Sequence, residues 1–428
     1  MRRWIFLIVL APLLYGCIHI YQPNELVYEF PDKFYTARVY YVKIGLKNTL
    51  GFLISGITVK VNGTEYRTDD SGYATIELYY EESGTKQMQI ECESFKKTIQ
   101  IKVEKPSWLI FLWLASDNNL DRYTDNDLKE ITSASEDVSV VILWDSSDQS
   151  RDGVYFLTNS SGIVLREKTG EINSGDGNLL NLYTNRFSKV ESDHKALIIW
   201  DHGLGWVDVV PKNYVVKGIS YDDESKDFLT IEEIANNVKG RWDVLGMDAC
   251  LMGSLEVVYA LRGCADYVVA SAHEIKGTGW DYRFLESVSR TTPFEFCKQI
   301  VDYYKEFYKD DHNTSLAVYG VDEISNAVDS LNSFLSQNSV DFQSRSWTVY
   351  NSTYDLYDLG EVLESLQATE TWEKFDEVVV YRYLSGAKPK SLATSVFVCA
   401  DKTKIELLNY VTTAFAVDTM WDEFLLSQ

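Results

Sequence analysis

The sequence lacks the short motifs that would assign it at once to a common enzyme class. It contains no CxxC pair, no HExxH and no GxSxG. These absences argue against zinc fingers, thioredoxin-like redox proteins, zinc peptidases and α/β-hydrolases. Six cysteines in 428 residues are also too few for a disulfide-stabilised scaffold. Each cysteine therefore needs its own explanation.

Basic runs are absent as well. The 40 Lys and Arg residues are outnumbered by 64 Asp and Glu residues, which gives a formal net charge of -24. A nucleic-acid partner is disfavoured, because it requires a basic surface to neutralise phosphates. The acidity fits a solvated surface and would also suit a basic peptide substrate. With 45% hydrophobic residues, the chain is long enough for two domains and an export segment.

The first 17 residues, MRRWIFLIVLAPLLYGC, have the proportions of an export signal. Arg2 and Arg3 precede an apolar stretch that is too short to be a comfortable transmembrane helix. The ending LYGC resembles the lipobox of bacterial lipoproteins, and this implies cleavage before Cys17 and lipidation of that residue. We therefore expect an exported lipoprotein, anchored to a membrane of the cell envelope. A plain signal peptide and an uncleaved anchor are the alternatives.

Two segments separate this signal from the main domain. Residues 18–34 contain Pro23 and Pro31 and are expected to form a tether. Residues 35–104 consist of short alternating runs with turn signals such as Asn62-Gly63, and they predict a small all-β sandwich. The stretch GITVKVNGTEYRTDDSGYATIEL resembles immunoglobulin-like or carboxypeptidase-regulatory modules of surface proteins. We expect this module to act as a spacer.

From Pro106 the pattern changes, and residues 106–428 are expected to form one α/β domain. Nearly continuous apolar runs predict strands that are buried on both faces, at residues 108–115, 138–144, 196–200, 242–247, 267–271, 316–321 and 393–398. Helical patterns lie between several of them, at residues 126–134, 230–238, 255–262, 293–308 and 321–337. This alternation predicts a mostly parallel sheet flanked by helices, with its site beyond the carboxyl ends of the strands.

Reactive side chains follow two of these strands. The run ALIIW leads into DHGLGW, which contains His202, and WDVLGM leads into DACLMG, which contains Cys250. A nearby imidazole can take the thiol proton or stabilise the thiolate, which yields a nucleophile at neutral pH. Gly203 would let its backbone N–H approach an oxyanion, and the N–H of Cys250 could be the second donor. Each residue alone is more often a packing residue, but the pair predicts a Cys–His hydrolase.

DHGLGW followed by DACLMG resembles the clostripain family of cysteine peptidases, within the wider caspase-like group. The segments WLIFLWLASDNNLD, SAHEIKGTGWDY, TYDLYDLGEVLESL and ATSVFVCADK extend the resemblance over most of residues 106–428. The resemblance implies a caspase-like fold, in which His202 is the catalytic histidine and Cys250 the nucleophile. It also implies that Gly203 and Cys250 donate their N–H groups to the oxyanion. No obligatory third acid is implied, so no triad is assigned.

The same resemblance implies cleavage after Arg or Lys, with acidic residues in the pocket for the preceding side chain. Asp248 matches one of these acids, although it could instead cap local backbone N–H groups. The second acidic position is occupied by His273, with Glu274 beside it. We therefore expect these three residues to contact the substrate, and the preference for Arg or Lys stays open.

The loop between the two motifs carries Lys212 and Lys217, which the resemblance implies as sites of activating self-cleavage. An uncleaved surface loop is the alternative. No cofactor is expected. Relatives can require calcium, which Asp222, Asp223 and Glu224 could bind, but the sequence alone assigns no metal site.

The sequence thus predicts a cysteine endopeptidase that acts on peptides or proteins. A catalytically silent surface-binding protein on a caspase-like scaffold is the alternative, with the sandwich as its ligand module. The intact His202 and Cys250 argue against this alternative. Neither the oligomeric state nor the pairing of Cys264, Cys297 and Cys399 follows from the sequence.

Overall fold

The computed structural model describes residues 22–93, 95–160, 162–207, 218–338 and 347–428. The chain divides into two units, which are described separately. One unit comprises Met1–Lys105 with Leu157–Gly162, and the other comprises Pro106–Phe156 with Ile163–Gln428.

The N-terminal unit contains two β-sheets. Their strand orders are β1-β3-β6 and β2-β8-β7-β4-β5. The strands are β1 (Pro23–Glu29), β2 (Phe34–Tyr35), β3 (Val39–Asn48), β4 (Thr58–Val61), β5 (Thr64–Arg67), β6 (Tyr73–Tyr79), β7 (Gly84–Cys92) and β8 (Phe95–Glu104). Buried side chains from both sheets, such as Val42, Ile76, Met88 and Ile101, form one core. Immunoglobulin-like character stays a prediction for this all-β unit.

The hairpin signal is confirmed, because β4 and β5 pair antiparallel around Asn62-Gly63. Both turn residues have positive φ angles, 48° and 87°, as a two-residue hairpin requires. The prediction that residues 18–34 form only a tether is wrong, since β1 pairs antiparallel with β3. In β1 only Leu26 is buried, so the strand has little apolar periodicity, and Pro23 stands at its first position, where a ladder hydrogen bond is not needed.

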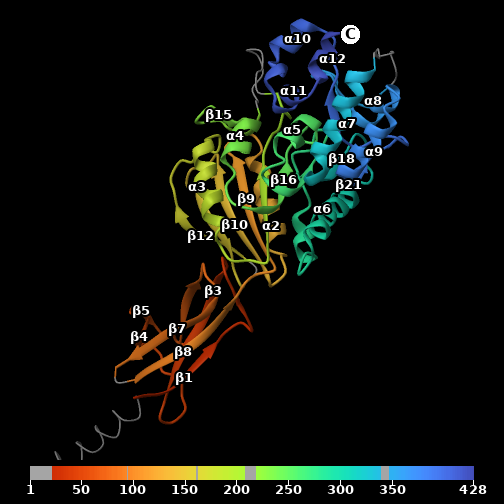
Figure 1. The fold of residues 1–428 in the computed structure, drawn as a ribbon. Helices are drawn as coiled ribbons and strands as arrows, with labels where there is room; N and C mark the ends of the chain where they lie inside the picture. Colours follow the sequence, from red (N-terminus) through yellow and green to blue (C-terminus); the bar gives the residue numbers. More distant parts are fainter. Residues whose placement is uncertain (1–21, 94, 161, 208–217, 339–346) are drawn as a thin grey trace, which may run out of the picture. The chain divides into compact units, whose positions relative to one another are not determined.

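A nine-stranded mixed sheet forms the centre of the larger unit, with the order β12-β11-β10-β9-β13-β16-β17-β18-β21 (Figure 1). Its strands are β9 (Trp108–Ser116), β10 (Val138–Ser146), β11 (Gly153–Leu157), β12 (Ile163–Lys168), β13 (His194–Trp200), β16 (Trp242–Asp248), β17 (Ala265–Ala270), β18 (Ser315–Gly320) and β21 (Val379–Leu384). The five strands from β10 to β17 in this order are parallel. Towards the edges β11, β18 and β21 pair antiparallel with their neighbours.

Helices cover both faces of the sheet. In β9, Trp108 stacks on Phe296 of α6, with ring centroids 4.0 Å apart. Phe111, on the opposite face, packs against Phe187 of α3 at 4.9 Å. Every residue of β9 and of β10 is buried, as the continuous apolar runs predicted. The expected α/β fold with central parallel strands is confirmed.

The helices of this unit begin and end as follows: α2 (Asp121–Ile131), α3 (Gly177–Phe187), α4 (Ile231–Asn237), α5 (Leu255–Ala260), α6 (Pro293–Phe307), α7 (Ile324–Gln337), α8 (Leu359–Ser365), α9 (Thr369–Val378), α10 (Lys402–Leu407), α11 (Ala414–Asp418) and α12 (Trp421–Leu426). Short 3-10 helices are η1 (Tyr282–Glu286), η2 (Val321–Glu323) and η3 (Tyr410–Thr412). Two small sheets complete the unit: β14 (Ile219–Asp222) with β15 (Asp227–Leu229), and β19 (Val349–Asn351) with β20 (Leu356–Asp358) and β22 (Ser395–Phe397).

One predicted strand of the large sheet is misplaced. The apolar run at 393–398 contains β22, which pairs with β20 in a separate small sheet. The terminal strand of the large sheet is instead β21, whose sequence VVYRYL is mostly half-buried. An edge strand of this kind has no continuous apolar run, so its sequence did not predict a strand.

Candidate functional site

Three neighbouring parallel strands end together at one edge of the large sheet. The register pairs Trp200 of β13 with Leu114 of β9 on one side and with Asp248 of β16 on the other. Two residues beyond this level stand His202, after β13, and Cys250, after β16. Parallel pairing therefore brings the two residues to the same edge, although they are 48 positions apart in the sequence.

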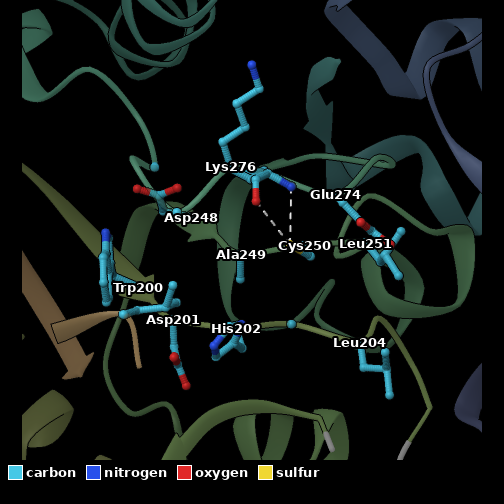
Figure 2. A pocket seen from close by; sticks show the side chains of 15 residues that line it. Trp200, Asp201, His202, Leu204, Asp248, Ala249, Cys250, Leu251, Glu274 and Lys276 are labelled. Atoms are coloured by element: carbon cyan, nitrogen blue, oxygen red, sulfur yellow. Dashed lines mark hydrogen bonds between the residues drawn. The ribbon is translucent and has the colours of Figure 1, made fainter. Parts of the chain in front are cut away.

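The Cys250 thiol is held against the segment that follows β17. Its Sγ accepts a hydrogen bond from the N–H of Ile275 at 3.2 Å and lies 3.4 Å from the Ile275 carbonyl oxygen (Figure 2). Burial raises the pKa of Cys250 to about 11, and the charges of Glu274 and Asp248 act in the same direction. The thiol is therefore protonated at neutral pH, and it needs a base before it can attack a substrate.

His202 has a partner that the sequence did not indicate. Its Nε2 lies 2.8 Å from Oδ1 of Asn119, in the turn after β9. With this oxygen as the acceptor, Nε2 carries the proton and Nδ1 keeps a free lone pair. Burial lowers the pKa of His202, and the charge of Asp223 partly opposes this effect. The imidazole is therefore neutral at pH 7 and can accept a proton.

Glycine is required where the two turns meet. A Cβ atom at position 203 would lie 2.4 Å from the carbonyl oxygen of Cys250, which real structures do not tolerate. Leu251 has a positive φ of 62°, and its N–H donates to the carbonyl oxygen of His273 at 3.1 Å. The backbone at Cys250 is thus fixed from both sides, next to the backbone of Gly203.

His202 and Cys250 line one cavity of about 350 Å³. Residues 200–204, 248–251 and 274–277 form its wall, together with Leu120 and Gly279. Figure 2 shows His202 and Cys250 on adjacent turns of this wall, while the side chain of Lys276 extends away from it. Lys276 forms an ion pair with Asp311 at 2.6 Å. The cavity therefore contains a thiol, a neutral imidazole and backbone N–H groups.

Asp248 contributes a buried carboxylate to this cavity. Its Oδ2 accepts hydrogen bonds from the N–H of Trp280 at 2.9 Å and the hydroxyl of Tyr282 at 3.1 Å. Its Oδ1 is buried and has no donor in bonding geometry. Burial raises the pKa of Asp248 to about 7, against the effect of these two donors. One oxygen is thus held by the protein, and the other is buried without a hydrogen-bond donor.

A second buried acid lies behind Asp248, and the sequence did not indicate it. Asp127 of α2 is 1% exposed, and neither of its carboxylate oxygens has a donor in bonding geometry. Burial first, and then the charge of Asp248, raises the pKa of Asp127 to about 9. Asp127 does not itself line the cavity, so it adds a second carboxylate close to Asp248 but outside the cavity wall. The signal that could have found Asp127 is an acid on the otherwise buried side of a helix.

The other two residues expected to contact substrate separate in space. Glu274 lines the cavity, and its Oε1 accepts a long hydrogen bond of 3.4 Å from Asn351. His273 does not line this cavity. Its Nδ1 lies 3.1 Å from the hydroxyl of Ser315, and its ring packs edge-on against Tyr350. It borders an adjacent cavity of about 390 Å³ instead.

Several predicted features lie outside the described residues, namely Cys17 and the lysines at 212 and 217. Within the described part of the chain, Cys92, Cys250, Cys264, Cys297 and Cys399 are all free thiols, and only Cys250 is not fully buried. No helix among the described residues is long and apolar enough to cross a membrane.

Comparison with known proteins identifies the family to which this fold and sequence belong. The model of the clostripain family matches residues 112–427. Clostripain of Hathewaya histolytica is 27% identical over 212 residues, which is 40% of this chain and 40% of that protein. The match thus spans two fifths of the length of this curated relative.

Solved structures agree on the fold. A secreted C11 cysteine protease from Bacteroides thetaiotaomicron, bound to an irreversible peptide inhibitor, has a TM-score of 0.63 and 20% identity, and the match covers 74% of this chain and all of that one. An inactive zymogen C11 protease from Parabacteroides distasonis has a TM-score of 0.62 and 18% identity, with 74% of this chain and 99% of that one covered. Since the family model covers well over half of the residues, the chain belongs to the clostripain family of cysteine peptidases.

Proposed function

We propose that the protein is a cysteine endopeptidase in which Cys250 is the nucleophile and His202 the base. The observation that carries this proposal is the shared cavity, where a protonated thiol and a neutral imidazole stand on adjacent turns. Family membership gives the class of reaction, and the shared cavity supports the roles that we propose for the two residues.

The reaction begins with transfer of the Cys250 proton to Nδ1 of His202. The sulfur then attacks the substrate carbonyl carbon, while the N–H groups of Gly203 and Cys250 hold the oxyanion. The N–H of Ile275, which already donates to Sγ, stabilises the negative charge on the sulfur. His202 returns its proton to the leaving amine, which departs and leaves an acyl thioester. Water activated by His202 hydrolyses the thioester and restores the thiol.

We propose a preference for Arg or Lys before the scissile bond. Asp248 has one oxygen without a donor, and Asp127 adds a second buried carboxylate behind it. A substrate cation would relieve the repulsion between these groups and would complete their hydrogen bonding. Glu274, at the rim of the same cavity, adds negative charge near the entrance.

Replacement of Cys250 tests the nucleophile. Cys250→Ala should lower kcat by at least about 10³-fold, since no other group can form the thioester. Cys264→Ala, a buried cysteine outside the cavity, should retain activity. Hydrolysis of a fluorogenic peptide measures both variants. On a denaturing gel, Cys250→Ala should also stay uncut at Lys212 and Lys217 if the chain cleaves itself there. Hydrolysis that survives in Cys250→Ala would refute the proposed nucleophile.

Asn119 is proposed as a positioning residue for the imidazole. Asn119→Ala should lower kcat about 3- to 30-fold with little change in KM, because one hydrogen bond to the ring is lost. Asn119→Asp keeps an acceptor but adds a negative charge, so it should raise the pKa of His202. The acidic limb of the kcat/KM profile should then move to higher pH. Asn326→Ala on α7 is the matched control. A pH profile that is identical in Asn119→Asp and the unmodified protein would contradict this role.

The charge of Asp248 can be tested by comparing kcat/KM for an Arg peptide with kcat/KM for a norleucine peptide. Titration of the thiol and imidazole affects both substrates equally, so it cancels in the ratio of the two values. Asp248 has a pKa of about 7, so its carboxylate is neutral below this pH and charged above it. The ratio of kcat/KM for an Arg peptide to that for a norleucine peptide should therefore rise through pH 7. Asp248→Asn should lower the plateau at least about tenfold, which is ~1.4 kcal/mol, and remove the pH dependence. A ratio that is flat with pH and insensitive to this change would exclude Asp248 from specificity.

We also propose that the protein is exported and held to a membrane through a lipid on Cys17. The lipobox-like LYGC supports this, and a similar protease of known structure is described as secreted. Cys17→Ser should move the protein from the membrane fraction of its producing cells to the soluble fraction, because the lipid would be lost. Equal partitioning of both forms would contradict the anchor.

A further inference from the structure

In the N-terminal unit, the loop between β3 and β4 presents two large apolar side chains to solvent. The side chain of Leu50 is 59% exposed and that of Phe52 is 68% exposed. They stand two positions apart at the tip of the loop, whereas Ile54, at its base, is buried. Single exposed apolar residues are ordinary on protein surfaces, but two at one loop tip form a patch that calls for a partner.

The backbone of this loop is fixed by hydrogen bonds. The buried side chain of Asn48 accepts from the N–H groups of Leu50 and Phe52, both at 3.0 Å. The N–H of Asn48 donates to the carbonyl oxygen of Phe52 at 2.9 Å. Gly51, between the two apolar residues, has a φ of 84°, which other residues rarely adopt. Turning Leu50 and Phe52 inward would break these bonds, so the loop holds both side chains outward.

The chain enters the N-terminal unit beside this loop. In the antiparallel pairing of β1 with β3, Pro23 stands opposite Asn48. Cys17, the proposed site of the lipid, lies six positions before Pro23 in the sequence. Six residues span at most about 20 Å even when they are fully extended. A lipid on Cys17 would therefore hold the base of the loop within about this distance of the membrane surface.

The chain leaves the N-terminal unit at the opposite end. Strand β3 runs for ten residues from Val39 to Asn48, which corresponds to about 30 Å. Glu104, the last residue of β8, pairs with Tyr35, and its carbonyl oxygen accepts a hydrogen bond from the N–H of Thr36 at 3.1 Å. These contacts lie next to the start of β3. The exit from the unit and the apolar loop are therefore separated by the length of this strand.

Charge does not oppose a membrane at this end of the unit. Residues 33–64 contain no Asp or Glu, although the whole chain has a formal net charge of -24. At the base of the loop, Glu25 forms an ion pair with Lys47 at 3.9 Å. The turn at 69–72 abuts the loop, and its Asp70 is exposed. This charge favours a shallow position of the loop among lipid headgroups over deep insertion.

We propose that Leu50 and Phe52 insert into the headgroup region of the membrane that holds Cys17, and thereby orient the N-terminal unit on it. This inference rests on the proposed lipid anchor. Apolar side chains that leave water at this boundary lower the free energy of the bound state. A lipid alone is a flexible tether, whereas the lipid and the loop together define which end of the unit faces the bilayer. The exit at Glu104 would then point away from it.

The loop is tested first without the lipid. The mature chain of residues 17–428 with Cys17→Ser lacks only the export signal and keeps every described residue. Its partition coefficient is measured by sedimentation with phosphatidylcholine vesicles over a range of lipid concentrations. The loop variant, Leu50→Ser with Phe52→Ser, should partition at least about tenfold more weakly than this parent, because the apolar surface of the loop is lost.

A matched control separates this loop from apolar exposure in general. Leu182→Ser with Val417→Ser removes side chains of α3 and α11 that are 59% and 69% exposed, and it should bind vesicles as the parent does. Equal loss of binding in the control, equal binding by the loop variant and the parent, or no binding by the parent would overturn the proposal. Both double variants should keep the Tm of the parent, because the replaced side chains are exposed. A lower Tm of the loop variant alone would show that the loop packs on protein, which also overturns it.

The position of the loop is tested in the lipidated protein. Cys250→Ala removes the one cysteine among the described residues that is not fully buried, so a nitroxide label reacts at Leu50→Cys or at Glu82→Cys, near the other end of β3. In vesicles, the label at position 50 should be more accessible to oxygen, and less to a water-soluble nickel complex, than the label at position 82. Equal accessibility of the two labels would overturn the proposal.

Shielding of the label at position 50 in the absence of vesicles would assign the loop to a second copy or another part of the chain, and would overturn the membrane contact. Mass spectrometry of the N-terminal peptide tests the anchor separately. If Cys17 carries no lipid, the proposed anchor fails, while vesicle binding by the unlipidated chain still decides whether the loop contacts lipid.

Discussion

The register of β9, β13 and β16 is the constraint on which the rest of the site depends. Parallel pairing aligns Leu114, Trp200 and Asp248 at one level, and the turns beyond them carry Asn119, His202 and Cys250. A one-residue slip of either strand would turn the side chains to the opposite face. β9 is buried along its whole length, and β13 and β16 are buried from Ala196 and Val244 to their ends, where the polar residues of the site begin.

Burial also sets the chemistry at this edge. It raises the pKa of the Cys250 thiol and lowers that of the His202 imidazole, so the resting pair is neutral. The same effect keeps Asp248 near its midpoint at neutral pH. In the proposed reaction, a substrate with Arg or Lys before the scissile bond would therefore change the charge state of Asp248 when it binds.

The sequence predicted the parts of the site that lie next to strand ends. DHGLGW and DACLMG stand directly after buried apolar runs, so His202 and Cys250 could be placed at one edge from the pattern alone. Asp248 could be predicted for the same reason. The fold followed from the alternation of apolar runs and helical segments, apart from β21, whose half-buried residues show no such run.

Other residues could not be predicted, because only the folded chain brings them together. Asn119 meets His202 from 83 positions away, and Asp127 lies behind Asp248 from a different element. The family resemblance led us to expect His273 in the cavity. Its carbonyl oxygen accepts a hydrogen bond from the N–H of Leu251, which has a left-handed backbone conformation. Its imidazole lies against Ser315 instead of the cavity.

In the proposed reaction, Cys250 becomes a nucleophile because His202 removes its proton. The most direct measurement is the rate at which a peptidyl electrophile ending in Arg labels the protein, with the adduct located by mass spectrometry. We expect one adduct per chain, on Cys250, formed at least about 10²-fold more slowly in His202→Ala. Labelling of another residue, or an equal rate in His202→Ala, would contradict it.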